Sequence, residues 1–142
     1  MNIISNSLQE TKQFAKEFVK KLKGGEVLGL VGELGAGKTV FTQGLAEALG
    51  VEEIVNSPTF VLMKMYKTKN SKLKTLIHMD AYRLESFNQL KEIGAEEYIN
   101  KKDCLVVIEW ADRVPEVRKY PKYQEIVFLE GENENQRAIK TE

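Results

Sequence analysis

Residues 32 to 39 read Gly-Glu-Leu-Gly-Ala-Gly-Lys-Thr and fit the pattern G-x-x-x-x-G-K-[ST]. Glycines at these positions let the backbone turn so that successive N–H groups point inward at phosphate oxygens. A short apolar run at residues 27 to 31 precedes this loop, and we expect a helix over about residues 39 to 49 that ends at Gly50. A chance match to this pattern would seldom be preceded by a predicted strand and followed by a predicted helix. The chain is therefore restricted to folds in which a strand, a phosphate-binding loop and a helix follow one another.

The loop predicts the binding of a nucleoside triphosphate with Mg²⁺. The positive end of the following helix is directed at the same phosphates as the loop N–H groups. Lys38 supplies a mobile charge for the β and γ phosphates, and the Thr39 hydroxyl can ligate Mg²⁺. The nucleotide-binding residues predicted here are Leu34, Gly35, Ala36, Gly37, Lys38, Thr39 and Val40.

Two carboxylates follow predicted strands. The apolar run at residues 104 to 108 is typical of a strand buried on both faces, and Glu109 comes directly after it. If this strand is parallel to the one before the loop, Glu109 lies at the phosphate edge of the sheet and can organise Mg²⁺, as a Walker B carboxylate does. Asp80 ends another predicted strand and can hold a magnesium-bound water or orient the attacking water, or it can simply pair with Arg83 or start a turn. His78, the single histidine, is interpreted as structural.

The remaining pattern predicts one α/β domain over residues 1 to 142, a P-loop NTPase-like domain with a mixed central sheet flanked by helices. Ser7 and Glu10 have the spacing of a capping box and open a helix over residues 7 to 22. A third helix is expected from Ser86, interrupted at Gly94. The predicted strands are residues 60 to 66 and 73 to 80, which form an antiparallel hairpin, then 125 to 130 and 137 to 139.

Composition limits the function classes. Lysine and arginine number 21, as do aspartate and glutamate, so the net charge is zero and autonomous binding to nucleic acid is not indicated. An RNA-linked role would need a partner to supply a basic surface. Cys104 is the only cysteine and is expected in the core, which suits a reducing cytosol. No apolar stretch approaches the roughly 20 residues that cross a bilayer, so we expect a cytoplasmic protein without a membrane contact.

Two features have more than one interpretation. Residues 57 to 59, Ser-Pro-Thr, lie where nucleotide hydrolases have a switch loop, but a plain turn into a strand fits equally well. Trp110 directly follows Glu109 and can pack in the core, line the site or lie on a partner surface.

Four motifs together resemble one family. GELGAGKT at residues 32 to 39, SPTF at 57 to 60, HMDAYRL at 78 to 84 and IEW at 108 to 110 occur in the order and approximate spacing of the TsaE family. Members of this family, also called YjeE ATPases, are small ATPases of bacterial threonylcarbamoyladenosine synthesis on tRNA. The resemblance extends from the first helix to about residue 115, and it implies an ATP- and Mg²⁺-dependent hydrolase.

The resemblance also implies roles for individual residues. Lys38 and Thr39 match the phosphate and magnesium residues, Glu109 the metal-binding glutamate and Asp80 the catalytic aspartate. Two further matches would contact the nucleotide: Thr11 in the first helix, and Arg137 as the arginine of a C-terminal Gly-Arg motif. The chain departs from the family pattern in three places: Glu33 replaces a common aspartate, Val40 replaces a common second threonine, and residues 132 to 136 separate Gly131 from Arg137.

The implied partners are the TsaB and TsaD proteins, with tRNA reached only indirectly through their complex. We also expect slow hydrolysis by the isolated chain, because no arginine lies near the loop in sequence to act as an arginine finger.

Other classes of P-loop protein give alternative interpretations. A small-molecule kinase usually has an arginine-rich lid, whereas this chain has four scattered arginines. A GTP-dependent switch protein would have an N-K-x-D motif that reads guanine, and we expect this chain to lack one. A nucleotide-binding subunit without catalytic activity is the third alternative.

Overall fold

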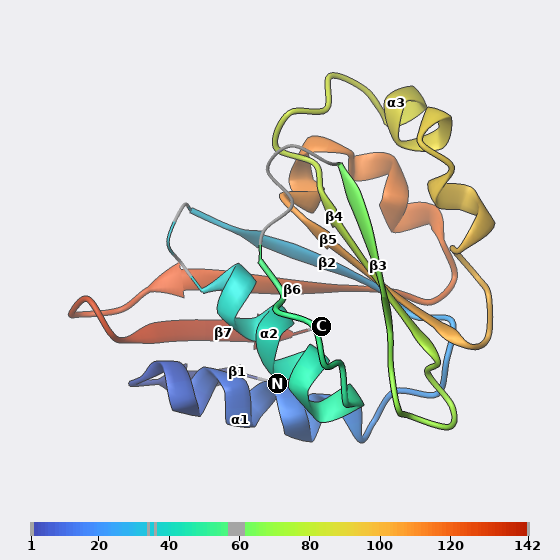
Figure 1. The fold of residues 1–142 in the computed structure, drawn as a ribbon. Helices are drawn as coiled ribbons and strands as arrows, with labels where there is room; N and C mark the ends of the chain where they lie inside the picture. Colours follow the sequence, from blue (N-terminus) through green and yellow to red (C-terminus); the bar gives the residue numbers. More distant parts are fainter. Residues whose placement is uncertain (1, 34, 36, 57–61, 142) are drawn as a thin grey trace.

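The computed structural model describes residues 2–33, 35, 37–56 and 62–141, and its helices and strands form one α/β arrangement around a mixed sheet (Figure 1). The strands are β1 Asn2–Ser5, β2 Val27–Gly32, β3 Met63–Lys67, β4 Thr75–Asp80, β5 Cys104–Glu109, β6 Tyr123–Glu130 and β7 Arg137–Thr141. The helices are α1 Leu8–Val19, α2 Lys38–Leu49 and α3 Phe87–Glu92, with short 3-10 helices η1 Ala95–Glu97, η2 Ala111–Arg113 and η3 Pro115–Lys119.

The sheet has the strand order β1-β7-β6-β2-β5-β4-β3. Its four central strands are parallel, because β2 pairs in parallel with both β5 and β6, and β4 pairs in parallel with β5. The other three strands pair antiparallel at the two sides. The mixed α/β sheet predicted from the sequence is confirmed, and so is the parallel pairing expected between the strand before the loop and the strand that ends in Glu109.

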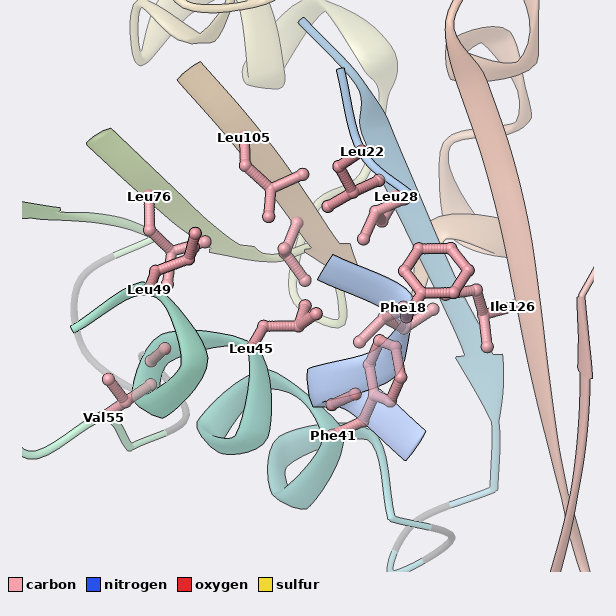
Figure 2. Packing of buried hydrophobic residues seen from close by; sticks show 14 of the residues in the cluster. Phe18, Leu22, Leu28, Phe41, Leu45, Leu49, Val55, Leu76, Leu105 and Ile126 are labelled. Atoms are coloured by element: carbon pink, nitrogen blue, oxygen red, sulfur yellow. The ribbon is translucent and has the colours of Figure 1, made fainter. Parts of the chain in front are cut away.

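Helices cover both faces of the sheet, which is why the central strands are continuously apolar. Every residue of β5 is buried. One face packs against α1 and α2, and Figure 2 shows Phe18, Phe41 and Leu45 of these helices lying over Leu28 and Leu105 of the sheet. The other face packs beneath α3 and the 3-10 helices through alternate residues of the same strands. Cys104 is buried, as expected.

Most element boundaries agree with the sequence-based prediction. Ser7 caps α1, since its hydroxyl accepts a hydrogen bond from the Glu10 backbone N–H at 3.1 Å, and Gly50 ends α2 in the left-handed conformation. The first helix ends at Val19, earlier than the predicted residue 22. The hairpin of β3 and β4 is antiparallel as predicted, although residues 60 and 61 of its predicted first strand lie outside the described residues. The strand β1 was not predicted.

No helix in the described part of the chain has the length and apolar character needed to cross a membrane.

Close packing of α1 against α2 depends on Gly44. A Cβ atom added at Gly44 would lie 2.8 Å from the Cβ of Ala15 and 2.9 Å from the Cα of Lys12. Such distances are too short for ordinary contact, and the Lys12 atom belongs to the backbone, which cannot rotate away. Glycine therefore lets α1 lie directly on the helix that follows the loop, and this contact fixes where the first turn of α1 meets the site.

We expect Gly44→Ala to destabilise the protein by about 1–3 kcal/mol, because overpacking outweighs the gain of about 1 kcal/mol that alanine gives in a helix. Urea denaturation followed by circular dichroism measures this change. Ala48→Gly, a substitution on the same helix at a half-buried position, serves as a control for helix propensity alone. A Gly44→Ala variant more stable than the wild type would show that the two helices can move apart without cost.

Candidate functional site

A cleft of about 570 Å³ lies where the carboxyl ends of β2, β4 and β5 meet the start of α2. Open α/β sheets bind their ligands at this edge. The cleft brings together all the sequence-predicted site residues that the structure describes: Thr11, Gly35, Gly37, Lys38, Thr39, Val40, Asp80, Glu109 and Arg137. Two predicted residues, Leu34 and Ala36, lie outside the described residues, as does the Ser-Pro-Thr segment at residues 57 to 59.

Lys38 is held inside the loop. It is only 5% exposed, and its ammonium group donates hydrogen bonds to the carbonyl oxygens of Gly32 at 2.5 Å and Glu33 at 2.9 Å. Burial lowers the pKa of this ammonium, and the carboxylates of Glu109 and Asp112 oppose that shift. These contacts with two carbonyl oxygens of its own loop hold the cation at the base of the cleft, ready for an anionic group.

Glu109 joins the sheet to the helix that follows the loop. The Thr39 hydroxyl donates to its carboxylate at 3.1 Å, although the two residues are 70 positions apart. Asp80 and Glu109 are direct partners in the parallel register of β4 and β5, so both carboxylates leave the sheet at the same level. The structure therefore places a hydroxyl and two carboxylates, all hard oxygen donors, at one edge of the sheet.

His78 is buried and is not among the residues that line the cleft, in agreement with its structural interpretation, but the sequence did not predict its contact with Glu109. It is fully buried, and its Nε2 lies 2.5 Å from Oε2 of Glu109. Its Nδ1 has no hydrogen-bond partner among the described residues. A neutral ring that donates from Nε2 leaves Nδ1 as a bare acceptor, which costs less in the interior than an unpaired N–H. The sequence could have indicated that His78 lies near the site, because His78 is two residues before Asp80 and alternate residues of a strand lie on one face.

Thr11 reaches the cleft from α1 through a contact with β1. It is buried, and its hydroxyl shares a hydrogen bond of 2.7 Å with the hydroxyl of Ser5. Ser5 also donates to the carbonyl oxygen of Ser7, the residue that caps α1. The unpredicted strand β1 thus holds the first turn of α1, with Thr11, Ser7 and Leu8 lining the cleft.

Arg137 reaches the loop in spite of its separation from Gly131. The intervening residues form the turn of the β6–β7 hairpin, closed by a hydrogen bond from the Gly131 N–H to the Gln136 carbonyl. Arg137 is therefore opposite Glu130 in the pairing of β6 with β7. Its guanidinium donates to the carbonyl oxygen of Gly35 at 2.8 Å and to those of Glu134 and Gln136.

Trp110 lines the cleft and also packs against the adjoining core. Its backbone is left-handed, with φ of 60°, which is uncommon for a bulky residue. The ring lies 4.0 Å from the Lys38 ammonium, a cation–π distance, and 4.9 Å from the ring of Tyr82. Arg113 in turn stacks on Tyr82 at 4.8 Å. The left-handed residue Trp110 therefore lies where aromatic rings pack beside the Lys38 ammonium.

Two arginines that are distant from the loop in sequence, Arg83 and Arg137, line the cleft. One expectation drawn from the sequence is wrong, because the chain does contain an N-K-x-D pattern: residues 100 to 103 read Asn-Lys-Lys-Asp. These four residues directly precede β5, at the amino end of the parallel strands. A strand of this length spans about 20 Å, so they lie on the edge opposite the loop and do not face the cleft.

The architecture defines a class of protein. A parallel strand leads through the Gly-rich loop into a helix, and the neighbouring parallel strand ends in a carboxylate that contacts the first turn of that helix. This is the arrangement of P-loop α/β proteins.

Comparison with known proteins narrows the class to a family. The family described as "Threonylcarbamoyl adenosine biosynthesis protein TsaE" matches residues 5–139. The tRNA threonylcarbamoyladenosine biosynthesis protein TsaE of Bacillus subtilis is 42% identical over 129 residues, which cover 90% of this chain and 77% of that protein. Its counterpart from Treponema pallidum is 39% identical over 129 residues, which cover 91% of this chain and 90% of that protein. The crystal structure of Bacillus subtilis YdiB is similar with a TM-score of 0.76 at 33% identity, covering 98% of this chain and 82% of that one.

The chain belongs to the TsaE family, whose members are described as proteins of tRNA threonylcarbamoyladenosine biosynthesis.

We expect His78→Leu to lower the free energy of unfolding by about 1.5–3 kcal/mol, because it removes a hydrogen bond to the buried carboxylate of Glu109. His78→Gln, whose amide N–H can also donate to that carboxylate, should recover most of the loss. Urea denaturation at neutral pH measures both variants. Equal destabilisation by leucine and glutamine would mean that ring packing, not the hydrogen bond to Glu109, accounts for the buried histidine.

Proposed function

We propose that this chain binds ATP with Mg²⁺ in the cleft and hydrolyses it in the cytoplasm, acting with the TsaB and TsaD proteins in threonylcarbamoyl modification of the adenosine beside the tRNA anticodon. The observation that carries the proposal is the contact between the Thr39 hydroxyl and the Glu109 carboxylate at 3.1 Å. It joins the loop helix to the end of a parallel strand, where a P-loop hydrolase needs a magnesium site.

The donor set at this point fits Mg²⁺. Magnesium prefers oxygen ligands and usually takes only one or two carboxylates, completing its shell with water and substrate phosphates. No group of three or more His, Cys, Asp or Glu side chains among the described residues could hold a metal ion alone. Thr39 and Glu109 would hold the ion, while Lys38 would bind the β and γ phosphates. When bound, Mg²⁺ neutralises charge that develops on the phosphate oxygens.

The proposed reaction is hydrolysis of the terminal phosphoanhydride. A water oxygen forms a bond to the γ-phosphorus as the bond from that phosphorus to the bridging oxygen of ADP breaks. Asp80, the direct register partner of Glu109 on the neighbouring strand, would orient this water and accept its proton. The buried His78 keeps the Glu109 carboxylate in one orientation during the reaction.

Partner proteins would complete the site. Three of the five N–H groups of the Arg137 guanidinium donate to backbone carbonyl oxygens, so only part of its donors is available to a phosphate. A cation supplied by a partner protein would add stabilisation as charge develops in the transition state. We therefore infer slow hydrolysis by the chain alone and faster hydrolysis once TsaB and TsaD bind.

Two alternative functions remain: one has a different phosphate acceptor, and the other binds a different nucleobase. A kinase would transfer the γ-phosphate to a small molecule, and the arginines that line the cleft, Arg83 and Arg137, are compatible with that chemistry. A GTP-dependent switch would need a guanine-reading motif beside the cleft, whereas the N-K-x-D pattern of this chain lies at the other edge of the sheet.

We expect ATP to bind more tightly than GTP, because no N-K-x-D segment faces the cleft from the described residues. Competition of unlabelled ATP and GTP against a fluorescent ATP analogue, with Mg²⁺ present, measures the two dissociation constants. Tighter binding of GTP would favour the switch protein over the ATPase.

We expect Asp80→Asn and Glu109→Gln each to lower kcat for ATP hydrolysis by about 10²-fold while changing ATP affinity far less, because both carboxylates act mainly in the transition state. Both substitutions keep the side-chain size, and the Glu109→Gln carbonyl can still accept from His78. Steady-state phosphate release, with and without purified TsaB and TsaD, gives the rates, and calorimetry gives the affinities.

Wild-type turnover in either variant would remove that carboxylate from the mechanism. Rapid hydrolysis by the chain alone, unaffected by TsaB and TsaD, would contradict the partner-completed site. Transfer of phosphate to an added small molecule in place of water would favour the kinase.

A further inference from the structure

Ten of the lysines lie in four loops that lead into the parallel strands. These loops are residues 20 to 26 before β2, 68 to 74 before β4, 100 to 103 before β5 and 119 to 122 before β6. Because parallel strands all begin at the same edge of a sheet, the four loops form its amino edge, opposite the Gly-rich loop (Figure 1). We name this surface the lysine edge; its lysines are Lys20, Lys21, Lys23, Lys69, Lys72, Lys74, Lys101, Lys102, Lys119 and Lys122.

Hydrogen bonds hold the four loops together. The backbone N–H of Gly25 donates to the carbonyl of Cys104, and that of Lys74 donates to the carbonyl of Asp103 at 2.8 Å. The side chain of Lys122 donates to the carbonyl oxygen of Gly24 at 2.7 Å. A Cβ atom at Gly24 would lie 2.1 Å from the Lys102 carbonyl oxygen, so these two loops touch. The lysine edge is therefore one continuous surface on a fixed framework.

Few negative charges compensate these lysines. The four loops contain only two acidic residues, Glu26 and Asp103, which gives the lysine edge a formal charge of +8. Glu26 is buried, and its carboxylate accepts hydrogen bonds from the backbone N–H groups of Lys23 and Gly24. Since the whole chain has a net charge of zero, the rest of the molecule has a charge of −8.

Eight of these ten lysines have no carboxylate partner within the described residues. Lys20 pairs with Glu17 and Lys69 with Glu52, both at exposed positions. Of these eight, Lys101 and Lys119 lie over aromatic rings and Lys122 donates to a backbone carbonyl oxygen. The other five are exposed and have neither an ion pair nor such a contact among the described residues: Lys21, Lys23, Lys72, Lys74 and Lys102. Beside them, Lys16, Lys20 and Lys72 line a hollow of about 500 Å³ between α1 and the β3–β4 loop. The surface thus has both unpaired cations and a concavity.

The composition of the lysine edge favours a phosphate backbone over a protein partner. Lysine is depleted in protein–protein interfaces, which have an apolar or aromatic centre. The large apolar side chains most exposed in the described residues, Ile4, Leu8, Ile54, Met65, Tyr82 and Leu129, all lie outside the four loops. Nucleic-acid backbones need only positive charge at suitable spacing, and that contact is independent of base sequence.

We propose that the lysine edge binds the phosphate backbone of RNA, with tRNA as the ligand because the family is one of tRNA biosynthesis. The contact is electrostatic, carries no base specificity and lies about 20 Å from the cleft across the sheet. Partner proteins would still select the adenosine to be modified. This binding depends on the charge distribution and the choice of tRNA on the family, and neither depends on nucleotide hydrolysis.

The test compares two pairs of substitutions in the full chain. Lys72→Gln with Lys102→Gln removes two unpaired lysines of the lysine edge; Lys64→Gln with Lys140→Gln removes two exposed lysines of β3 and β7 and is the matched control. Fluorescence anisotropy with a labelled tRNA transcript gives the dissociation constant from 50 to 300 mM KCl. We expect the first pair to weaken binding at least about fivefold at 100 mM KCl and to reduce the slope of log K against log salt by about 2. The control pair should change neither.

Several results would overturn the proposal. These are unchanged tRNA binding in the Lys72/Lys102 variant, equal losses in the control pair, or tighter binding of polyglutamate or of phosphatidylglycerol vesicles than of tRNA. Phosphate release by the same variants separates the two proposals. A wild type that binds tRNA through the lysine edge but hydrolyses no ATP would refute only the proposed ATPase, and an active ATPase without tRNA binding would refute only the lysine edge.

Discussion

The buried carboxylate of Glu109 is the interaction on which the site depends. A charged group in the interior is costly unless donors surround it, and here the Thr39 hydroxyl and the His78 ring approach it from a helix and from a neighbouring strand. Each of these donors is therefore fixed by the same carboxylate that it stabilises. The start of α2, the end of β5 and the middle of β4 cannot shift separately without leaving that charge unpaired. This gives the Gly-rich loop a rigid support on the side of the sheet.

Parallel pairing turns three distant sequence segments into one site. The register puts Leu30 of β2 opposite Glu109 of β5, and Glu109 opposite Asp80 of β4. Side chains at the same register position leave a parallel sheet on the same face, so the loop and both carboxylates need no further device to meet. The remaining residues arrive from the side: β1 and β7 pair with each other and bring Thr11 and Arg137 to the opposite wall of the cleft.

The sequence predicted those features that depend on local pattern. The loop, its flanking strand and helix, and the strand that ends at Glu109 all carry strong apolar periodicity or a fixed motif. Features decided by long-range pairing were harder to see. The strand β1 has four residues and little apolar pattern, so only its pairing with β7 defines it. The contact of His78 with Glu109 was not predicted, because the two residues are 31 positions apart. Arg137 reaches Gly35 through a hairpin turn whose length the sequence motif does not indicate. The N-K-K-D segment is the opposite case: it matches a local motif, but the strand order puts it at the edge of the sheet away from the cleft.

Net charge does not show where the charges lie, for a related reason. A sum over the chain treats all side chains as if they shared one surface, whereas a parallel sheet sorts loops into two sets, one at each edge. The loops at the amino edge are lysine-rich, and the residues at the carboxyl edge include Glu33, Asp80, Glu109 and Asp112 around Lys38. Equal totals therefore conceal a lysine-rich amino edge whose compensating carboxylates are distributed over the rest of the molecule. Such a molecule has no long-range field from net charge, but within a Debye length of about 8 Å at physiological salt the lysine edge can attract an anionic partner. The topology that gathers phosphate-binding groups at one edge also leaves the other edge free for a second, separate contact.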